Sequence, residues 1–371
     1  MLKIAIVGCG KIADDHVAQI QRIKGCEIVG VCDREPLMAQ QLYKRFPIKQ
    51  HYSQLDRMLS DAKPDVVHIT TPPQSHFSLA KTCLEAGCHV YVEKPFTVYE
   101  RETRELLALA TAKGLKMTAG HDDQFRHATR RMRELIQSGY IGPEVVHMES
   151  HFCYELGPGA YAGALLSDKN YWVRKLPGGL LHNVISHGIA RIAEYISSEN
   201  PTVIAHGFIS PLLKGMGETE LIDELRVIVS EEKGATAYFT FSSQMRPALH
   251  SFRIYGTKNG LMIDQDQETL TKLRGQRAVS YVEKFVPPMT MARQYMGNSF
   301  GNVKRFLRRD FHMKSGMKYL MESFYKSIVD REPLPIPYRE IILTAHIMEN
   351  IFGQLRESST SRLVACGAEA R

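Results

Sequence analysis

The sequence has few of the features that mark a secreted, zinc-binding or membrane protein. Its seven cysteines are odd in number, scattered, and form no C-x-x-C pair, which argues against a disulfide framework and a metal site. No apolar run approaches the length of a membrane span, and strand-forming residues follow Met1 directly, which leaves no room for a signal peptide. We therefore expect a cytoplasmic protein without a bound metal or a membrane span.

A nucleic-acid-binding pattern is also missing. The 47 lysines and arginines exceed the 40 acidic residues, for a formal net charge of +7, but they do not interleave densely with aromatic residues. The excess suits an anionic cofactor or substrate, and we expect no nucleic-acid partner. The length of 371 residues, with 44% hydrophobic and 23% charged residues, suits two ordinary globular domains.

The first distinctive stretch is a short apolar run that leads into a glycine turn. Ile4 to Val7 is continuously apolar, as in a parallel strand covered on both faces. The next residues fit the pattern G-x-G-x-x-A, in the order Gly8, Cys9, Gly10, Lys11, Ile12 and Ala13. In this pattern the first glycine allows a tight turn, the second lets the backbone approach a pyrophosphate, and the alanine keeps the helix close to the sheet.

A second apolar run, Glu27 to Cys32, ends in Asp33, twenty residues after Ala13. A carboxylate at this place can accept both ribose hydroxyls of NAD and repel the 2′-phosphate of NADP. Arg34 could soften that preference by pairing with the phosphate. The alternative to a dinucleotide site is that Gly8 and Gly10 form an ordinary turn and Asp33 caps a helix. We expect NAD as the cofactor, with NADP less favoured.

Alternating strand-like and helical patterns continue through residues 1–122. Helical patterns cover 36–46, 55–59, 75–86 and 101–113, and extended runs cover 65–70 and 89–92. The alternation predicts a doubly wound parallel sheet of the Rossmann type, in which ligands lie beyond the carboxyl ends of the strands.

Two segments follow such strands. In the first, Thr71 and Pro72 could contact the cofactor, whereas His76 could contact it or only cap or pack. In the second, Glu93 and Lys94 come directly after the strand 89–92, where a nicotinamide would lie. The alternative for Lys94 is a simple surface pair with Glu93.

The sequence resembles the Gfo/Idh/MocA family, relatives of glucose-fructose oxidoreductase and inositol dehydrogenase. The resemblance rests on four segments in this order and at these separations: GCGKIA, CDRE, TTPPQSH and AGCHVYVEKP. The resemblance implies that Lys94 contacts substrate and nicotinamide and takes part in proton transfer. It also implies that the dinucleotide is held by Gly8, Gly10, Ala13, Asp33 and Thr71. Independently, a partly dry lysine beside another cation can exchange a proton near neutral pH.

Successive strand patterns dominate the second domain, 123–357, after a helix at 128–138. They cover 145–153, 202–210, 225–230, 235–243, 251–255 and 261–264, which predicts an α+β domain with a mostly antiparallel open sheet. In the family the open face of this sheet commonly makes an oligomer interface, so a homodimer or homotetramer is expected. The last helices, about 319–329 and 339–355, are expected to return to the first domain, and residues 358–371 to form a frayed tail.

The second chemical stretch, Pro177 to His187, resembles the family's G-G-G-x-x-x-D-x-x-x-H segment, which implies that His187 is the catalytic histidine. Asn183 stands where relatives usually carry aspartate; an amide cannot take a proton but can bond a hydroxyl. On a helix, Asn183 and His187 would share one face. We therefore expect Lys94, Asn183 and His187 to be catalytic, and these three with Trp172 and His182 to bind substrate. A purely structural histidine is the alternative.

The segment Glu283 to Ser315 contains Pro287, Pro288 and a basic run from Lys304 to Arg309. It could form a lid, a docking arm or a surface helix on an anionic membrane or polymer, or else a solvated helix or subunit contact.

The combined pattern predicts an NAD-dependent dehydrogenase that moves hydride between nicotinamide and a ring carbon of a sugar, sugar derivative or cyclitol. Two alternatives stay open. One is a redox-neutral glycosidase that uses NAD for oxidation followed by elimination. The other is a non-catalytic dinucleotide-binding regulatory protein.

Overall fold

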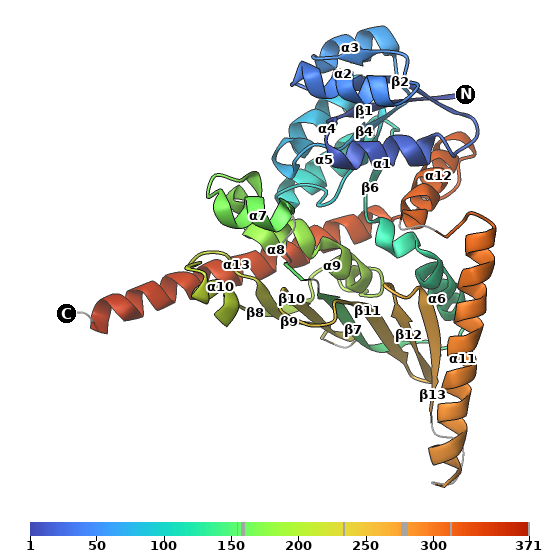
Figure 1. Ribbon diagram of the computed structural model, residues 1–371, viewed down its shortest axis with the longest axis vertical. Coiled ribbons are helices and arrows are strands. Elements are labelled where there is room, and N and C mark those ends of the chain that lie inside the picture. Colours follow the sequence, from blue (N-terminus) through green and yellow to red (C-terminus); the bar gives the residue numbers. More distant parts are fainter. Residues whose placement is uncertain (154, 157–159, 233, 276–280, 312–313, 370–371) are drawn as a thin grey trace. The chain divides into compact units, whose positions relative to one another are not determined.

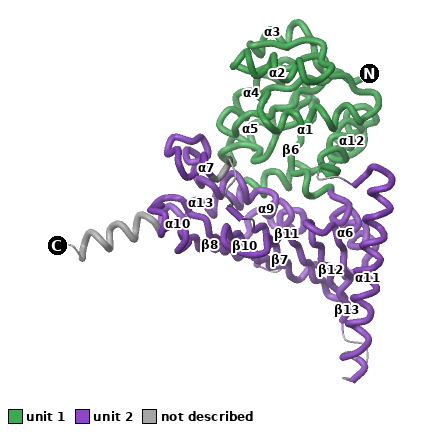
Figure 2. The backbone as a smooth tube through the Cα atoms, in the orientation of Figure 1, with its two compact units in different colours: residues 1–125, 313–345 green, residues 126–312, 346–371 purple. Residues whose placement is uncertain are grey.

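The computed structural model describes residues 1–153, 155–156, 160–232, 234–275, 281–311 and 314–369. Its contacts group the chain into two compact units, which Figure 2 shows in green and purple. Unit 1 consists of residues 1–125 and 313–345, and unit 2 of residues 126–312 and 346–371. Residues 313–345, which include the first of the last helices expected to return to the first domain, group with residues 1–125 in unit 1.

Unit 1 contains a parallel six-stranded sheet in the order β3-β2-β1-β4-β5-β6, which confirms the predicted doubly wound fold. Its strands are β1 (Leu2–Val7), β2 (Cys26–Cys32), β3 (His51–Tyr52), β4 (Val66–Ile69), β5 (His89–Val92) and β6 (Met117–Ala119). Ile4 and Ile6 of the central strand β1 are fully buried, which explains its continuous apolar run. The strand order reverses between β1 and β4, the place where such sheets bind ligands.

The helices that lie wholly in the parallel-sheet unit are α1 to α5, drawn in blue to cyan in Figure 1, and the later helix α12. Their bounds are α1 (Lys11–Ile20), α2 (Pro36–Arg45), α3 (Leu55–Ala62), α4 (His76–Glu85), α5 (Glu100–Ala112) and α12 (Ser315–Val329). Two short 3₁₀ helices, η1 (Pro73–Ser75) and η2 (Asp122–Phe125), follow β4 and β6. Helix α4 packs on α5, and α1 packs on α12.

Unit 2 contains a seven-stranded sheet in the order β13-β12-β11-β7-β10-β9-β8. Among the described strands of this sheet, the pairing of β7 with β10 is parallel and the other pairings are antiparallel, which confirms the mostly antiparallel prediction. The strands are β7 (Val145–Cys153), β8 (Thr202–Phe208), β9 (Glu224–Ser230), β10 (Thr236–Ser242), β11 (Leu249–Gly256), β12 (Asn259–Asp264) and β13 (Thr269–Arg274). Strand β13 was not expected, because its buried alternate positions include Thr269 and Thr271 in place of aliphatic residues.

One face of this sheet packs on helix α9 (Ser186–Ala193), which contacts β7 and β10. Exposed apolar side chains occupy directly paired positions on neighbouring strands. Ile204 of β8 pairs with Ile228 of β9, which pairs with Tyr238 of β10, and these side chains are 57%, 43% and 52% exposed. We call these three residues the apolar row.

The other helices of unit 2 are α6 (His127–Gln137), α7 (Ala160–Ser167), α8 (Gly179–Val184), α10 (Pro211–Gly215) and α11 (Val282–Leu307), with the 3₁₀ helix η3 (Trp172–Lys175). Helix α13 (Tyr338–Glu369) begins in unit 1 and ends in unit 2. It continues through the residues expected to be frayed, because no proline follows Pro337 to stop it.

The segment 283–315, for which the sequence left several roles open, consists mostly of helix α11. This helix lies beside the edge strand β13 (Figure 1). The side-chain amides of Gln294 and Asn298 each donate to and accept from the backbone of β13, at Lys272 and Leu270 respectively. These bonds satisfy backbone groups that an edge strand would otherwise expose. Helix α11 therefore closes this edge of the sheet.

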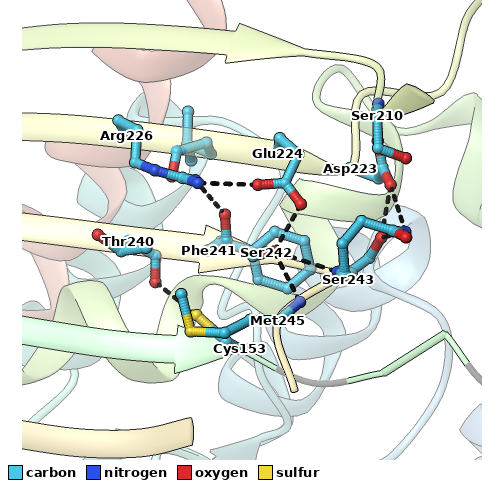
Figure 3. A network of polar contacts seen from close by, with 12 residues as sticks. Cys153, Ser210, Asp223, Glu224, Arg226, Thr240, Phe241, Ser242, Ser243 and Met245 are labelled. Carbon is cyan, nitrogen blue, oxygen red and sulfur yellow. Dashed lines mark hydrogen bonds and ion pairs between the residues drawn. The ribbon is translucent and has the colours of Figure 1, made fainter. Parts of the chain in front are cut away.

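A buried acidic pair lies at the open end of the β9–β10 hairpin, where β9 begins and β10 ends, as Figure 3 shows. Asp223 accepts from the Ser210 backbone N–H at 2.6 Å, and Glu224 accepts from Arg226 at 2.9 Å. The hydroxyls of Ser243 and Ser242 donate to the same two carboxylates. Because each carboxylate accepts several local bonds, we assign this pair a structural role.

Candidate active site

The glycine loop joins β1 to α1 in unit 1. Gly8 has a φ of 95°, and a Cβ there would lie 2.6 Å from Thr71 Cγ2, so this position requires glycine. A Cβ at Gly10 would meet no described atom beyond its chain neighbours within 4 Å. Gly10 is the N-cap of α1, and among the described residues no side chain caps this helix. The loop thus leaves room for a phosphate at a helix start that offers backbone N–H groups.

The three residues that open α1 differ in exposure. Lys11 is exposed, Ile12 is half-buried, and Ala13 is fully buried against the core. Cys9 lies between the glycines and is buried; burial and the nearby Asp33 carboxylate raise its thiol pKa to about 12. Cys9 therefore stays protonated and acts as a packing residue.

Asp33 is held at the carboxyl end of β2 by backbone donors. Its Oδ2 accepts the Cys9 N–H at 2.7 Å, and its Oδ1 accepts the Glu35 N–H at 2.9 Å. The carboxylate is half-buried, whereas the neighbouring Arg34 is exposed. Asp33 is thus fixed beside the glycine loop, as the ribose of a dinucleotide requires.

The loop after β4 braces the same region. The Thr70 hydroxyl donates to the Gly8 carbonyl at 2.6 Å, and Ser75 donates to the Thr71 hydroxyl at 2.8 Å. Pro72 is exposed, whereas His76 is fully buried. The two ring nitrogens of His76 lie 2.8 Å from the Thr71 carbonyl and 3.0 Å from the Pro95 carbonyl. His76 thus links this loop to the Lys94 turn, and its direct contact with a cofactor stays a prediction.

Lys94 follows β5 and is half-buried, and its backbone N–H donates to Glu93 Oε2 at 3.2 Å. Glu93 is only 6% exposed, which excludes the alternative of a surface pair. Burial lowers the pKa of Lys94, and the Lys314 cation lowers it as well, while Glu93 and Asp122 raise it. The net direction is downward, which makes the neutral amine accessible at lower pH than in an exposed lysine.

The residues of unit 1 therefore fit a dinucleotide. The open helix start suits the pyrophosphate, the fixed carboxylate of Asp33 suits the ribose, and the Lys94 turn follows a strand of the same sheet. Among the described residues, no cluster of three or more His, Cys, Asp or Glu side chains could hold a metal ion.

In unit 2, Asn183 lies on α8 and His187 lies on α9. Ile185 separates the two helices but keeps α-helical backbone angles, with its N–H bonded to the Leu181 carbonyl at 3.0 Å. Asn183 and His187 are half-buried. The His187 ring lies 5.7 Å from the Phe152 ring of β7, centroid to centroid. The two side chains thus belong to one helical turn beside the sheet.

His182 and Trp172 lie close to the same segment in sequence but differ in their surroundings. His182 is buried and its ring stacks on Phe352 at 4.7 Å, whereas Trp172 is half-buried at the start of η3. A cavity of about 440 Å³ opens beside the start of α8. Its lining includes Gly178, Gly179, Phe352 and the charged residues Arg174, Glu220 and Arg356.

Several buried residues of unit 1 near Lys94 were not expected from the sequence. They are His16 of α1, His68 of β4 and Tyr325 of α12. His68 carried a signal, because it is the one polar residue in the otherwise apolar strand Val66–Ile69. Tyr325 carried none, since it is more than two hundred residues away from its hydrogen-bond partner His68.

Comparison with known families agrees with this arrangement. Residues 2–121 match the model of the oxidoreductase family with an NAD-binding Rossmann fold, and residues 129–262 match the GFO/IDH/MocA C-terminal domain. The chain belongs to the Gfo/Idh/MocA family of oxidoreductases, and its N-terminal part is the family's NAD-binding domain.

Two relatives illustrate the likeness. D-glucoside 3-dehydrogenase of Escherichia coli (strain K12) is 32% identical over 142 residues, which are 38% of this chain and 40% of that protein. The match thus spans less than half of that relative. The WlbA dehydrogenase from Bordetella pertussis, solved with NADH and UDP-GlcNAcA, superposes with a TM-score of 0.76 at 16% identity over 96% of each chain.

A putative myo-inositol dehydrogenase from Sinorhizobium meliloti 1021 superposes with a TM-score of 0.69 at 17% identity, over 95% of this chain and 98% of that one. At these identities, the structural likeness establishes the fold. No helix in the described part of the chain combines the length and apolar character needed to cross a membrane.

Proposed function

We propose that this protein is an NAD-dependent dehydrogenase that oxidises a secondary alcohol on the ring of a sugar, sugar derivative or cyclitol, or reduces the corresponding ketone. The observation that carries the proposal is the half-buried Lys94 with a lowered pKa, in a sheet whose glycine loop and Asp33 fit a dinucleotide. When bound, the nicotinamide supplies the acceptor for the hydride.

Lys94 manages the proton of the reacting hydroxyl. In the oxidation direction the substrate C–H leaves as hydride, and the neutral Lys94 amine takes the O–H proton, so that a carbonyl and an ammonium result. Burial and the Lys314 cation favour the neutral amine before the reaction. Glu93 and Asp122 favour the ammonium after it.

In unit 2, we propose roles in substrate handling for Asn183 and His187. The His187 imidazole can accept or donate a proton, whereas the Asn183 amide can only hydrogen-bond a hydroxyl. We assign proton handling to His187 and orientation of the substrate to Asn183. Trp172 and His182 are assigned to substrate binding, because they lie close to Asn183 and His187 in the sequence.

Asp33 supports NAD over NADP. Both of its oxygens are fixed by backbone N–H groups, so the carboxylate cannot easily turn away from a 2′-phosphate. Arg34 is exposed, so its side chain could turn toward a 2′-phosphate and soften the preference for NAD.

The apolar row supports a homo-oligomer. Ile204, Ile228 and Tyr238 form a continuous exposed strip across three strands, and such a strip is typical of an interface core. We assign a homodimer or homotetramer in the cytoplasm. Light scattering of the wild type and of Ile228→Asp tests this assignment: the variant should be smaller, and a monomeric wild type would contradict it.

The experiment for the function is a substrate panel. The full-length protein is incubated with NAD and a set of sugars, glycosides, sugar nucleotides and cyclitols, while NADH and released aglycone are both followed. NADH that accumulates with a matching ketone supports the dehydrogenase. Aglycone release without net NADH would replace it by the redox-neutral glycosidase, and NAD binding without any turnover would leave the regulatory alternative.

A further inference from the structure

A continuous chain of hydrogen bonds lies buried behind the Lys94 turn, entirely within unit 1. The Tyr325 hydroxyl lies 2.7 Å from His68 Nε2, the two Nδ1 atoms of His68 and His16 lie 2.9 Å apart, and His16 Nε2 lies 2.9 Å from Glu93 Oε1. His16 and His68 are fully buried, and Tyr325 and Glu93 are 4% and 6% exposed. We call these four residues the histidine chain.

The positions of the hydrogens in this chain can be assigned by starting from Glu93. Burial by itself would raise the pKa of Glu93, but the hydrogen bond and the charge of His16, together with the Lys94 cation, lower it, so Glu93 is ionised. An ionised carboxylate only accepts, so His16 Nε2 carries the hydrogen that it donates to Glu93. Burial lowers the pKa of His68 well below its usual value, so His68 is neutral.

When His16 carries its hydrogen on Nε2 alone, one assignment satisfies every bond. His16 Nδ1 is then an acceptor, so His68 must carry its hydrogen on Nδ1 and accept at Nε2 from the Tyr325 hydroxyl. Tyr91 fixes the plane of the His68 ring, because the two rings stack at 4.5 Å with an angle of 1° between their planes. The hydrogen bonds therefore all run in one direction, from Tyr325 to Glu93.

We propose that the histidine chain is a positioning device for Lys94: it keeps the His16 N–H directed at Glu93, holds Glu93 ionised, and thereby sets the charge of Lys94. Glu93 has two carboxylate oxygens with two duties. Oε1 accepts from His16, and Oε2 accepts from the Lys94 backbone N–H. The inference rests on the proposed function only for its consequence in turnover, because the coupling itself is a property of unit 1.

Other charges around Lys94 define the background for this coupling. Asp122 and Asp123 of η2 raise the pKa of Lys94, and Lys314 lowers it. Lys314 lies 3.6 Å from the Asp15 carboxylate of α1. The histidine chain, as its four residues define it, does not include any of these groups, so a change at His16 alters the contribution of Glu93 and leaves theirs in place.

The test replaces His16 in two ways. In His16→Leu the buried Glu93 loses its donor and takes up a proton, so Lys94 loses a neighbouring negative charge and its pKa falls by about 1 unit or more. In His16→Gln the amide donates to Glu93 and accepts from His68, so the pKa of Lys94 stays near the wild-type value. His51→Gln, an exposed histidine on the opposite edge strand β3, is the matched control and should change nothing.

The measurement is a pH titration of Lys94 by NMR of the full-length protein with methyl-labelled lysines, in which the Lys94 signal is identified by its loss in Lys94→Arg. An equal Lys94 pKa in the wild type and in folded His16→Leu overturns the proposal. No substrate is needed, so a failure of polyol oxidation removes the proposed function and leaves this test intact. Intact turnover with an unmoved pKa removes only the histidine chain.

A second measurement covers the case in which His16→Leu does not fold. Nitrogen NMR of labelled histidines reports which ring nitrogen carries the hydrogen. The wild type should show His68 protonated on Nδ1, and Tyr325→Phe, which removes a single hydroxyl, should shift part of the population to Nε2. A wild-type His68 protonated mainly on Nε2 contradicts the assigned direction of the chain and overturns the proposal.

Discussion

The two chemically distinctive stretches of this protein differ in what holds them in place. In unit 1, Gly8 is fixed by close backbone contact and Asp33 by two backbone donors. In unit 2, Asn183 and His187 lie on short helices beside glycines that pack on aromatic rings: a Cβ at Gly178, the N-cap of α8, would lie 2.3 Å from the Phe352 ring, and one at Gly188 of α9 would lie 2.4 Å from the Phe239 ring. A dinucleotide always offers the same phosphates and ribose, so a backbone site suits it, whereas sugars differ and need side chains.

The largest effect is expected at Lys94. Lys94→Met removes the amine that exchanges the hydroxyl proton and leaves the glycine loop intact. Because one positioned acid or base contributes roughly 10²–10⁴ in rate, kcat should fall by that order while NAD affinity barely changes. Steady-state kinetics and NADH fluorescence titration measure both quantities. A kcat near the wild-type value would remove Lys94 from the chemistry.

The pH dependence of the same reaction has a defined sign. A lowered pKa means that the neutral Lys94 amine forms at lower pH than in an exposed lysine, so the rate of oxidation should rise with pH in a range below the ordinary lysine pKa of about 10.4. The profile of kcat/KM for the wild type measures this limb. A limb that lies at or above the ordinary value would show that burial does not dominate at Lys94.

The next effect concerns unit 2 and separates His187 from Asn183. His187→Ala should cost about 10² in kcat/KM because it removes a proton-handling group. Asn183→Ala should cost only about tenfold, since it removes one hydrogen bond to substrate. Asn183→Asp restores the carboxylate usual in relatives and serves as the third variant. Equal losses for the two alanine variants would contradict the separate roles, and an unchanged rate for His187→Ala would make it structural.

A matched pair of glycines sharpens the contrast between folding and binding in unit 1. Gly8→Ala forces a side chain into a positive φ and against Thr71, so it should lower the free energy of unfolding by about 1–3 kcal/mol. Gly10→Ala meets no such obstacle and should leave that free energy unchanged while weakening NAD binding. Thermal unfolding and NADH titration separate the two. A Gly10→Ala protein with wild-type affinity would show that the phosphate lies elsewhere.

The smallest effect is expected at Asp33. Asp33→Ser removes the charge that repels a 2′-phosphate, so the ratio of NADPH to NADH affinity should rise, by about tenfold if one ionic contact is involved. Asp56→Asn, an exposed carboxylate on α3, is the control. Fluorescence titration with both reduced cofactors gives the ratio. Tighter binding of NADPH than NADH by the wild type would refute the assignment of NAD.

The sequence was most informative where a ligand imposes a fixed pattern. The glycine loop, Asp33 and the Glu93–Lys94 turn could be placed because apolar strands bracket them, and the two sheet types followed from the strand patterns. The histidine chain could not be predicted, because hydrogen bonds between residues as distant as His68 and Tyr325 leave no local pattern. Strand β13 and the amide contacts of α11 were missed for a related reason: polar side chains there satisfy a sheet edge.

The most direct test of the account is to follow the hydride itself. The wild-type protein is mixed with NAD and an accepted polyol that carries deuterium on the reacting ring carbon, and the mass of the reduced cofactor is measured. The account predicts that deuterium accumulates in NADH together with the ketone, and that Lys94→Met forms this product at least a hundredfold more slowly at unchanged NAD affinity. Deuterium that stays on the sugar, or appears only in solvent, would contradict it.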